Sequence, residues 1–204
     1  MKLYGSQTSP DVRKVRVVAA ERAIPLDFTV DDPWQDGARL HAMTPIGKVP
    51  VLELDDGRVL FESLLLIEYL DASAPGPRML PAEGDARWAA LRGHALAHAL
   101  IDAAVTRLLE TRRPEPLRMP ERMAREEARL GRILDRAEAE LGDSDPERPS
   151  FVELMLGVAL QYVDFRQPQD WRTPRPRLAA LSARLAPRPS FRDTQPPGFK
   201  PVET

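Results

Sequence analysis

The chain has 204 residues, of which 43% are hydrophobic and 29% are charged, and its formal net charge is -2. These values are typical of a soluble globular protein with one large or two small domains, and they give no positive field that would attract nucleic acid or an anionic membrane. The absence of cysteine excludes disulfides, thiolate zinc sites, iron–sulfur clusters and a cysteine nucleophile, so any thiol chemistry must use the thiol of a ligand.

The sequence predicts no membrane segment and no export signal. No apolar run approaches the roughly 20 residues that a membrane span needs. The first ten residues, MKLYGSQTSP, lack the apolar core and the cleavage pattern of a signal peptide. We therefore expect a cytoplasmic protein without a membrane partner.

Strand and helix patterns alternate in the first third of the chain. KLYG and LDFTV are typical of short strands, and the segment between them has apolar residues three to four apart, which predicts a helix. After a loose segment, VLEL and RVLF flank the turn Asp-Asp-Gly and predict a hairpin, which a helix follows. The order β-α-β and then β-β-α predicts a small mixed sheet with helices on its faces, which is the thioredoxin arrangement. The predicted strands are 2–5, 26–30, 51–54 and 58–61, and the predicted helices are 10–23 and 62–73.

A second domain, all helical, follows a proline-rich linker. Residues 74–84 contain three prolines and two glycines, so we place a first domain at 1–74, a linker at 75–84 and a second domain at 85–204. Beyond the linker we find only helical patterns, and we expect the tail after Pro187 to be irregular. The predicted helices are residues 85–110, a helix that Pro120 begins and Gly142 ends, a helix after the capping box Ser150-x-x-Glu153, and 174–185.

His98 and Asp102 interrupt an apolar stripe along the long helix over 85–110. One hypothesis is that this helix lines a cleft for a second substrate, with both side chains in it. The alternative is a buried histidine that is hydrogen-bonded to the aspartate one turn later. With three histidines in the chain and no third ligand at a useful spacing, we expect no metal site.

The segment 166–192 carries seven arginines and one acidic residue, Asp170. A basic cluster can attract an anionic partner. We expect instead that these arginines form a solvated face, some of them paired with the acidic stretch at 138–153, and we expect no nucleic-acid partner.

Three motifs of the first domain resemble those of the cytosolic glutathione S-transferases. They are TSPDVRKVR at 8–16, PIGKVPVL at 45–52 and FESLLLIEYL at 61–70, and YVDFR at 162–166 is similar to a bacterial, serine-type group of that family. The resemblance covers nearly the whole chain. It implies an α/β N-terminal thioredoxin-like domain followed by an all-helical domain, a homodimer, glutathione as co-substrate and a small hydrophobic electrophile as second substrate.

The resemblance also assigns glutathione-binding residues. It implies that the Val49–Pro50 bond is cis and that the Val49 main chain pairs with the cysteinyl residue of glutathione as a short antiparallel strand. Glu62 and Ser63, at the start of a helix, would hold the γ-glutamyl ammonium and carboxylate; a simple helix cap uses the same residues. Lys48 is the first candidate for the glycine carboxylate, with Arg39 and His41 as alternatives.

Ser9 is the candidate catalytic residue, because it lies just before Pro10 at the start of a helix. A hydroxyl donor and free helix N–H groups would stabilise the glutathione thiolate and lower the pKa of its thiol. Thr8 and Ser6 remain alternatives, and a plain N-cap role for Ser9 is a further one. Two other functions also remain open: a glutathione-dependent isomerase, and a non-catalytic binding protein of the same fold.

Overall fold

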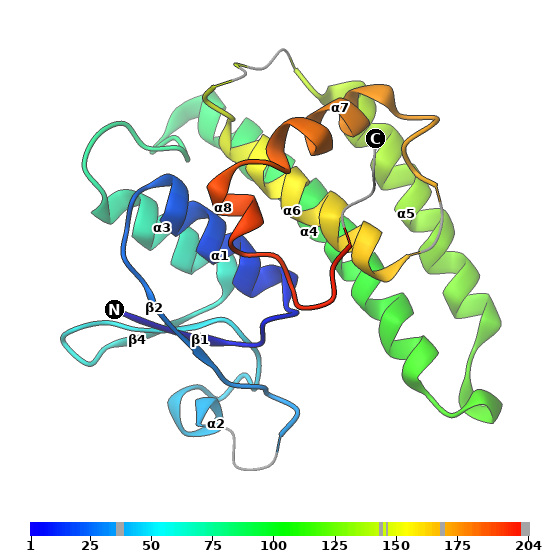
Figure 1. The fold of residues 1–204 in the computed structure, drawn as a ribbon, viewed down its shortest axis with the longest axis horizontal. Coiled ribbons are helices and arrows are strands. Elements are labelled where there is room, and N and C mark those ends of the chain that lie inside the picture. The colour runs from blue at the N-terminus through cyan, green and yellow to red at the C-terminus, as the bar shows by residue number, and fades with distance from the viewer. Residues whose placement is uncertain (36–38, 143–144, 146, 168–169, 201–204) are drawn as a thin grey trace. The chain divides into compact units, whose positions relative to one another are not determined.

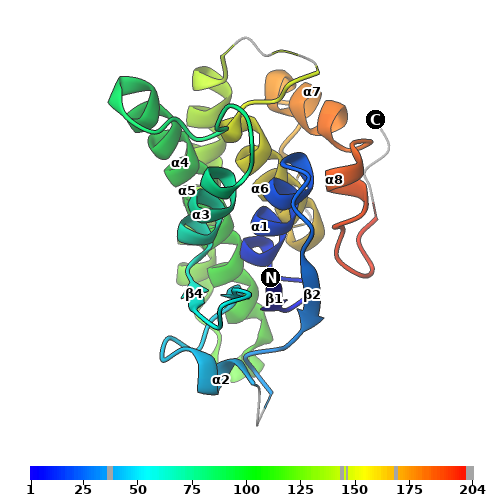
Figure 2. The ribbon, with the colours of Figure 1, turned by 90° about the vertical axis from the view of Figure 1, so that its left-hand side faces the viewer.

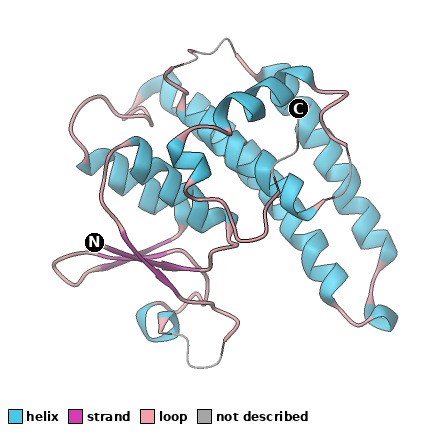
Figure 3. Ribbon diagram, in the orientation of Figure 1, coloured by secondary structure: helices cyan, strands magenta, loops and turns pink. Residues whose placement is uncertain are grey.

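The computed structural model describes residues 1–35, 39–142, 145, 147–167 and 170–200 (Figure 3). By its internal contacts the chain divides into two compact units. The first consists of Met1–Ala82 together with Arg188–Phe199, and the second is built on Glu83–Pro187.

The first unit contains a four-stranded sheet in the order β2-β1-β3-β4. β1 pairs in parallel with β2 and antiparallel with β3, and β3 pairs antiparallel with β4. The helix α1 connects the two parallel strands, so the predicted thioredoxin arrangement is confirmed. The elements are β1 (Lys2–Gly5), α1 (Pro10–Glu21), β2 (Asp27–Val30), α2 (Leu40–Met43), β3 (Val51–Glu53), β4 (Val59–Phe61) and α3 (Ser63–Ser73).

Two helices cover one face of this sheet, and the short helix α2 lies on its other side (Figures 1 and 2). α1 packs against α3, and both bury apolar side chains such as Val15, Val18 and Leu66. At the end of β1, Gly5 leaves no room for a side chain, since a Cβ there would lie 2.4 Å from a methyl group of Val12. The start of α1 therefore sits directly on the end of β1.

The C-terminal tail adds a helix to the first unit. The segment expected to be irregular contains α8 (Pro189–Arg192), which packs against α1. Arg188 and Ser190 both donate hydrogen bonds to the carboxylate of Glu21 on α1. Arg13 of α1 donates to the Phe191 carbonyl at 3.1 Å. The sequence pattern did not reveal this docking, because it depends on charges far apart in the chain.

The second unit is all helical in its described residues. Its elements are α4 (Gly84–Arg112), the 3-10 helix η1 (Glu115–Leu117), α5 (Pro120–Glu140), α6 (Phe151–Arg166) and α7 (Pro176–Leu185). α4 packs against both α5 and α6. The predicted capping box is confirmed, with Ser150 and Glu153 each accepting the other's backbone N–H. None of the helices in the described ranges is long and apolar enough to span a membrane.

The arginines of the 166–192 segment are mostly paired. Arg184 forms an ion pair with Glu153, which is the pairing with the acidic stretch that we expected, and the guanidinium of Arg177 donates to the backbone carbonyl of Glu138. Arg172 forms an ion pair with Asp164 at 2.6 Å, and Arg175 forms one with Asp135 at 2.7 Å. The basic residues of this segment are thus largely used within the protein.

The face of α4 that is buried in the second unit, where α4 packs against α5 and α6, differs from the apolar stripe seen in the sequence. His94, Ala97, Ile101 and Ala104 are among the buried residues, whereas Trp88 and Leu109 of the stripe are exposed. The two helices approach closely at Gly93, where a Cβ would lie 2.6 Å from both methyl groups of Val152. The absence of a side chain at Gly93 therefore allows the two helices to approach this closely.

Gly93→Ala should destabilise the protein by about 1–3 kcal/mol, because the added methyl group overpacks the α4–α6 contact. Gly131→Ala on α5 is the matched control. Its Cβ would meet only Arg175 Nη2, at 4.0 Å, so the higher helix propensity of alanine should stabilise the protein by up to about 1 kcal/mol. Urea unfolding measures both effects, and equal effects of the two substitutions would contradict the close packing at Gly93.

The tail contact should weaken in acid. Burial alone would raise the pKa of Glu21, but hydrogen bonds from Arg188 and Ser190 outweigh it and hold this pKa below its ordinary value. A carboxylate with a depressed folded-state pKa stabilises the protein above the unfolded-state pKa and loses that contribution as the pH falls through the folded-state value. The difference in unfolding free energy between the wild type and Glu21→Gln should therefore shrink as the pH is lowered from about 7 to about 3. A constant difference over this range would show that the charge of Glu21 does not hold the tail.

Candidate functional site

Three chain segments meet at one end of the sheet. The register pairs Tyr4 of β1 with Val51 of β3, and Val51 with Phe61 of β4. Because β3 is antiparallel to both neighbours, the end of β1, the start of β3 and the end of β4 lie side by side. The predicted residues Ser9, Val49 to Pro50 and Glu62 to Ser63 follow or precede these strand ends. The topology thus places them at the same end of the sheet.

Ser9 caps the start of α1. Its backbone is extended and its Oγ accepts the Val12 N–H at 3.3 Å, with Pro10 as the first helical residue. The alternative hydroxyls lie in the same loop, where Ser6 Oγ and Thr8 Oγ1 are 3.3 Å apart and form a hydrogen bond. The side chain of Ser9 is only partly buried. The capping role is therefore observed, and a ligand role for the same hydroxyl remains a prediction.

Tyr4 has a structural role. It is buried, and its hydroxyl donates to Glu53 Oε2 at 2.6 Å. Its ring packs with Leu40 and Val51 in a small core that Val49 also contacts. The phenol is thus occupied within the sheet, which leaves the hydroxyls of the loop after β1 as the candidates for thiol activation.

The Val49–Pro50 peptide bond is cis, as the resemblance implied. β3 begins at the next residue, Val51. Within the residues that the structure describes, the Val49 N–H and C=O form no backbone hydrogen bond. These two groups are therefore open to an extended peptide beside the start of β3.

The carboxylate of Asp11 links the starts of α1 and α3. The ammonium group of Lys14 lies 2.7 Å from Asp11 Oδ1, and the Lys14 side chain is fully buried. Ser63, the first residue of α3, donates from its Oγ to the same Asp11 oxygen at 3.2 Å. Sequence reasoning missed Asp11 and Lys14, although an opposite-charge pair three residues apart on a predicted helix was a visible signal.

Glu62 caps α3 with its own side chain. Its φ of 80° lies in the left-handed region, which is uncommon for a residue with a side chain. This conformation turns the carboxylate back, so that Oε1 accepts the Ser63 N–H at 2.9 Å. The first N–H of α3 therefore already faces a carboxylate, as the charge at a helix start favours.

Lys48, Arg39 and His41 are exposed. Arg39 lies over the ring of Tyr4 at 5.9 Å, and in the described part of the chain Lys48 makes no ion pair. The part of the preceding loop at 36–38 lies outside the described residues. Lys48 is thus an available cation, whereas the guanidinium of Arg39 is in contact with an aromatic ring.

His98 and Asp102 are both exposed on α4, so the alternative of a buried histidine is wrong. The His98 ring stacks on His94, with 6.0 Å between the ring centroids. Asp102 forms an ion pair with Arg129 of α5 at 2.9 Å. Their role in a second-substrate cleft stays a prediction. No group of three or more metal-binding side chains that could hold an ion occurs among the described residues.

This end of the first unit can bind a zwitterion with an attached peptide. Two helix starts provide N–H groups and favour negative charge, and the carboxylate of Glu62 favours a positive group next to it. The open main chain of Val49 can extend the sheet by one short strand. A peptide with an amino-acid head group has both features.

Comparison with known proteins agrees with this geometry. The family described as "Glutathione S-transferase, N-terminal domain" matches residues 3–78, and "Glutathione S-transferase, C-terminal domain" matches residues 120–184. The chain is 31% identical to "Uncharacterized GST-like protein YibF" of Escherichia coli (strain K12) over 97% of this chain and 99% of that protein.

Two similar crystal structures contain glutathione or a conjugate of it. A glutathione S-transferase from Methylobacillus flagellatus KT with glutathione bound is 36% identical to this chain, with a TM-score of 0.89. The match covers 96% of this chain and 98% of that one. A glutathione transferase family member from Pseudomonas fluorescens Pf-5, with bound S-(propanoic acid)-glutathione, is 31% identical with a TM-score of 0.85. All of this chain and 98% of that one are covered.

Proposed function

Because the chain belongs to the glutathione S-transferase family, we propose that it binds reduced glutathione and presents the thiolate to a small hydrophobic electrophile. The observation that carries this proposal is the pair of helix starts at one end of the sheet, joined through Asp11 and Ser63. One start would receive the head group of the tripeptide, and the other would receive its sulfur.

The γ-glutamyl group is proposed to bind at the start of α3. Its carboxylate would take the Ser63 N–H, which Glu62 now caps, and Glu62 would turn to the neighbouring ammonium group. Val49 would pair with the cysteinyl residue through its main chain, next to Pro50. Lys48 is proposed to meet the glycine carboxylate, since its ammonium is exposed at the same end of β3.

Ser9 is proposed to stabilise the thiolate. A cysteine thiol with a pKa of about 8.5 is mostly protonated at neutral pH. A hydroxyl donor at the start of α1, together with the charge of the helix start, would lower this pKa. A decrease of about 2 units corresponds to about 2.7 kcal/mol and makes the thiolate the main species. Ser9 Oγ would keep its role as N-cap, since an oxygen that accepts the Val12 N–H can still donate its own proton.

The bound thiolate would then add to the electrophile or displace a leaving group from it. No covalent enzyme intermediate is needed, since glutathione supplies the nucleophile and the chain has no cysteine. Proximity would supply most of the acceleration, and electrostatic stabilisation of the thiolate the rest. His98 and Asp102 are proposed to face the second substrate from α4, and the family resemblance supports a homodimer with a role in cytoplasmic detoxification.

Calorimetry with glutathione and a turnover assay with a chloronitroaromatic acceptor test the function in two steps. Binding with turnover supports a transferase, and binding without turnover on several acceptors supports a non-catalytic binding protein. Turnover of a carbonyl-conjugated double bond without consumption of glutathione would instead indicate an isomerase. Absence of glutathione binding would refute the proposal.

Ser63→Ala should weaken glutathione binding at least tenfold, about 1.4 kcal/mol or more, since it removes a hydroxyl at the proposed carboxylate site. Calorimetry measures the dissociation constant. Ser73→Ala is a matched control on the same helix, where the hydroxyl is exposed and donates to the Tyr69 carbonyl at 2.7 Å. An unaltered dissociation constant for Ser63→Ala would show that Glu62 and Ser63 only cap the helix and do not bind glutathione.

Ser9→Ala should raise the pKa of the bound glutathione thiol towards about 8.5. The ultraviolet absorbance of the thiolate, titrated against pH in the binary complex, measures this pKa directly. Ser6→Ala and Thr8→Val are the controls, and each should leave the pKa unchanged. If Ser6→Ala or Thr8→Val raises the pKa of the bound thiol and Ser9→Ala does not, the residue that activates the thiol is the one whose substitution raised the pKa.

A further inference from the structure

Lys14, in the second turn of α1, is a fully buried cation. Its ammonium group lies 2.7 Å from Asp11 Oδ1, and its side chain has no exposed surface. Lysine is almost never fully buried, because its ammonium group loses its hydration. Replacing a buried ion pair by apolar residues is often neutral or stabilising, so the stability of the fold alone does not account for a cation here.

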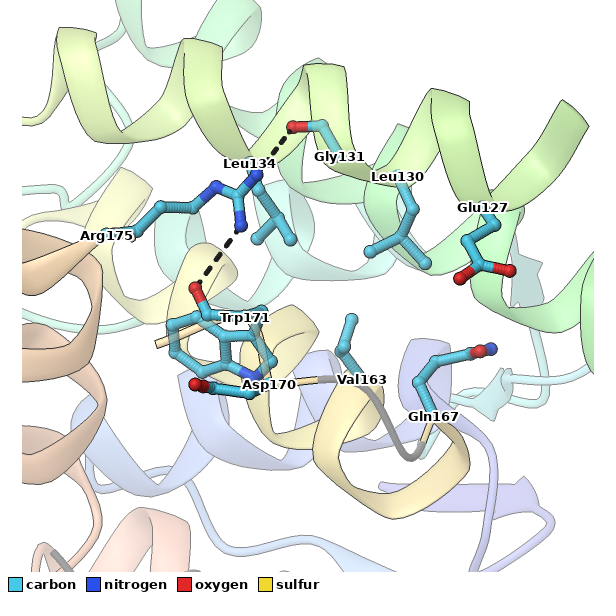
Figure 4. A pocket seen from close by; sticks show the side chains of 9 residues that line it. All are labelled: Glu127, Leu130, Gly131, Leu134, Val163, Gln167, Asp170, Trp171 and Arg175. Atoms are coloured by element: carbon cyan, nitrogen blue, oxygen red, sulfur yellow. Dashed lines mark hydrogen bonds between the residues drawn. The ribbon is translucent and has the colours of Figure 1, made fainter. Parts of the chain in front are cut away.

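A cation in the second unit shows the contrasting case. Arg175 lines a pocket between α5 and the end of α6, and its guanidinium donates to the carbonyls of Gly131 and Trp171 (Figure 4). It also pairs with Asp135 of α5 at 2.7 Å. The contacts with Gly131 and Asp135 join α5 to the segment before α7, so the role of Arg175 lies in the fold of its own unit. Lys14 differs, because its carboxylate partner also contacts a residue proposed to bind a ligand.

The carboxylate of Asp11 connects this cation to the proposed ligand site. The Asp11 side chain is 27% exposed, and its Oδ1 also accepts the hydroxyl of Ser63 at 3.2 Å. The Ser63 N–H, which donates to Glu62 Oε1 at 2.9 Å, is the group proposed to take the γ-glutamyl carboxylate. With glutathione bound, Ser63 would therefore lie between two carboxylates, that of Asp11 on its hydroxyl and that of the ligand on its N–H.

The charge balance of this arrangement depends on Lys14. Two carboxylates on one residue repel each other unless a cation balances one of them. Lys14 lies at ion-pair distance from Asp11, so the two side chains together are neutral. Asp11 can then hold Ser63 without adding a net negative charge beside the anion site.

We propose that Lys14 is a positioning residue of the glutathione site and acts through Asp11. Its ammonium group balances the charge of Asp11, and Asp11 holds Ser63 at the start of α3. The ligand carboxylate can then take the Ser63 N–H without meeting an unbalanced charge on Asp11. The inference rests on the proposed function, because it concerns how the same site accepts the γ-glutamyl head group.

Lys14→Met tests the proposal by calorimetry with glutathione. Methionine fills a similar space with an unbranched apolar chain and removes the charge. Glutathione should bind about tenfold more weakly, because its carboxylate then meets the unbalanced charge of Asp11. Lys2→Met is the matched control, since it makes the same change in net charge at an exposed residue at the other end of β1. This control should leave the dissociation constant unchanged.

The wild type and the Lys14→Met variant together separate a failure of this inference from a failure of the proposed function. If the wild type binds glutathione and Lys14→Met binds it equally well, the inference is wrong and the proposed function stands. If the wild type does not bind glutathione, both are refuted.

Salt distinguishes a charge effect from a packing defect. The Debye length falls from about 30 Å at about 0.01 M salt to about 3 Å at about 1 M, so the repulsion between Asp11 and the bound carboxylate should be largely screened. The affinity ratio between the wild type and Lys14→Met should therefore fall from about tenfold towards about threefold. A ratio that is independent of salt would assign the loss to packing and contradict the proposal.

Lys14→Met combined with Asp11→Asn removes both charges, and it serves as the test if the single variant does not fold. The amide oxygen of the asparagine can still accept the Ser63 hydroxyl, so the double variant should bind glutathione within about twofold of the wild type. Circular dichroism confirms that each variant is folded. A folded double variant that binds glutathione about tenfold more weakly than the wild type would show that charge balance is not the role of Lys14.

Discussion

The ion pair between Lys14 and Asp11 is the interaction on which the proposed glutathione site depends. A fully buried ammonium group needs an opposite charge beside it, and Asp11 provides one at 2.7 Å. The same carboxylate oxygen accepts the hydroxyl of Ser63 at 3.2 Å. A hydrogen bond to a charged group contributes about 1.5–3 kcal/mol, so this link is strong enough to hold the start of α3 beside that of α1. Two helix starts then favour negative charge at the same place, which neither would do as strongly alone.

Steric constraints fix the position of the loop between β1 and α1. At Gly5 a side chain would clash with Val12, so the strand and the helix are in direct contact where the chain turns. The four residues Ser6 to Ser9 cross this short distance, and Ser9 ends the turn by capping the helix. The Ser9 side chain is short, and its hydroxyl is held at the helix start by the hydrogen bond from the Val12 N–H. This is the property that a thiolate-stabilising group needs, because its donor must be in place before the thiol loses its proton.

Local patterns in the sequence predicted what depends on local chemistry. The hairpin around Asp-Asp-Gly, the capping box at Ser150 and the mixed sheet of the thioredoxin arrangement all followed from short stretches and from the handedness of β-α-β units. Contacts between distant segments could not be predicted in this way. The sequence shows an apolar stripe along α4, but the buried residues of this helix lie on another face, and α6 approaches it closely at Gly93. Likewise, the docking of α8 through Glu21 and the link from Asp11 to Ser63 join residues that are more than 50 positions apart.

The carboxylate of Glu62 on the Ser63 N–H has a consequence for the head group that the site would select. A simple anion that took this N–H would displace Glu62 and leave its carboxylate close to the new negative charge, whereas the charge of Asp11 is already balanced by Lys14. A zwitterionic head group avoids this repulsion, because its carboxylate takes the N–H while its ammonium pairs with the displaced Glu62. The γ-glutamyl end of glutathione carries both charges on one carbon atom. The carboxylate of Glu62 at the start of α3 would therefore favour an amino-acid head group over a plain carboxylate.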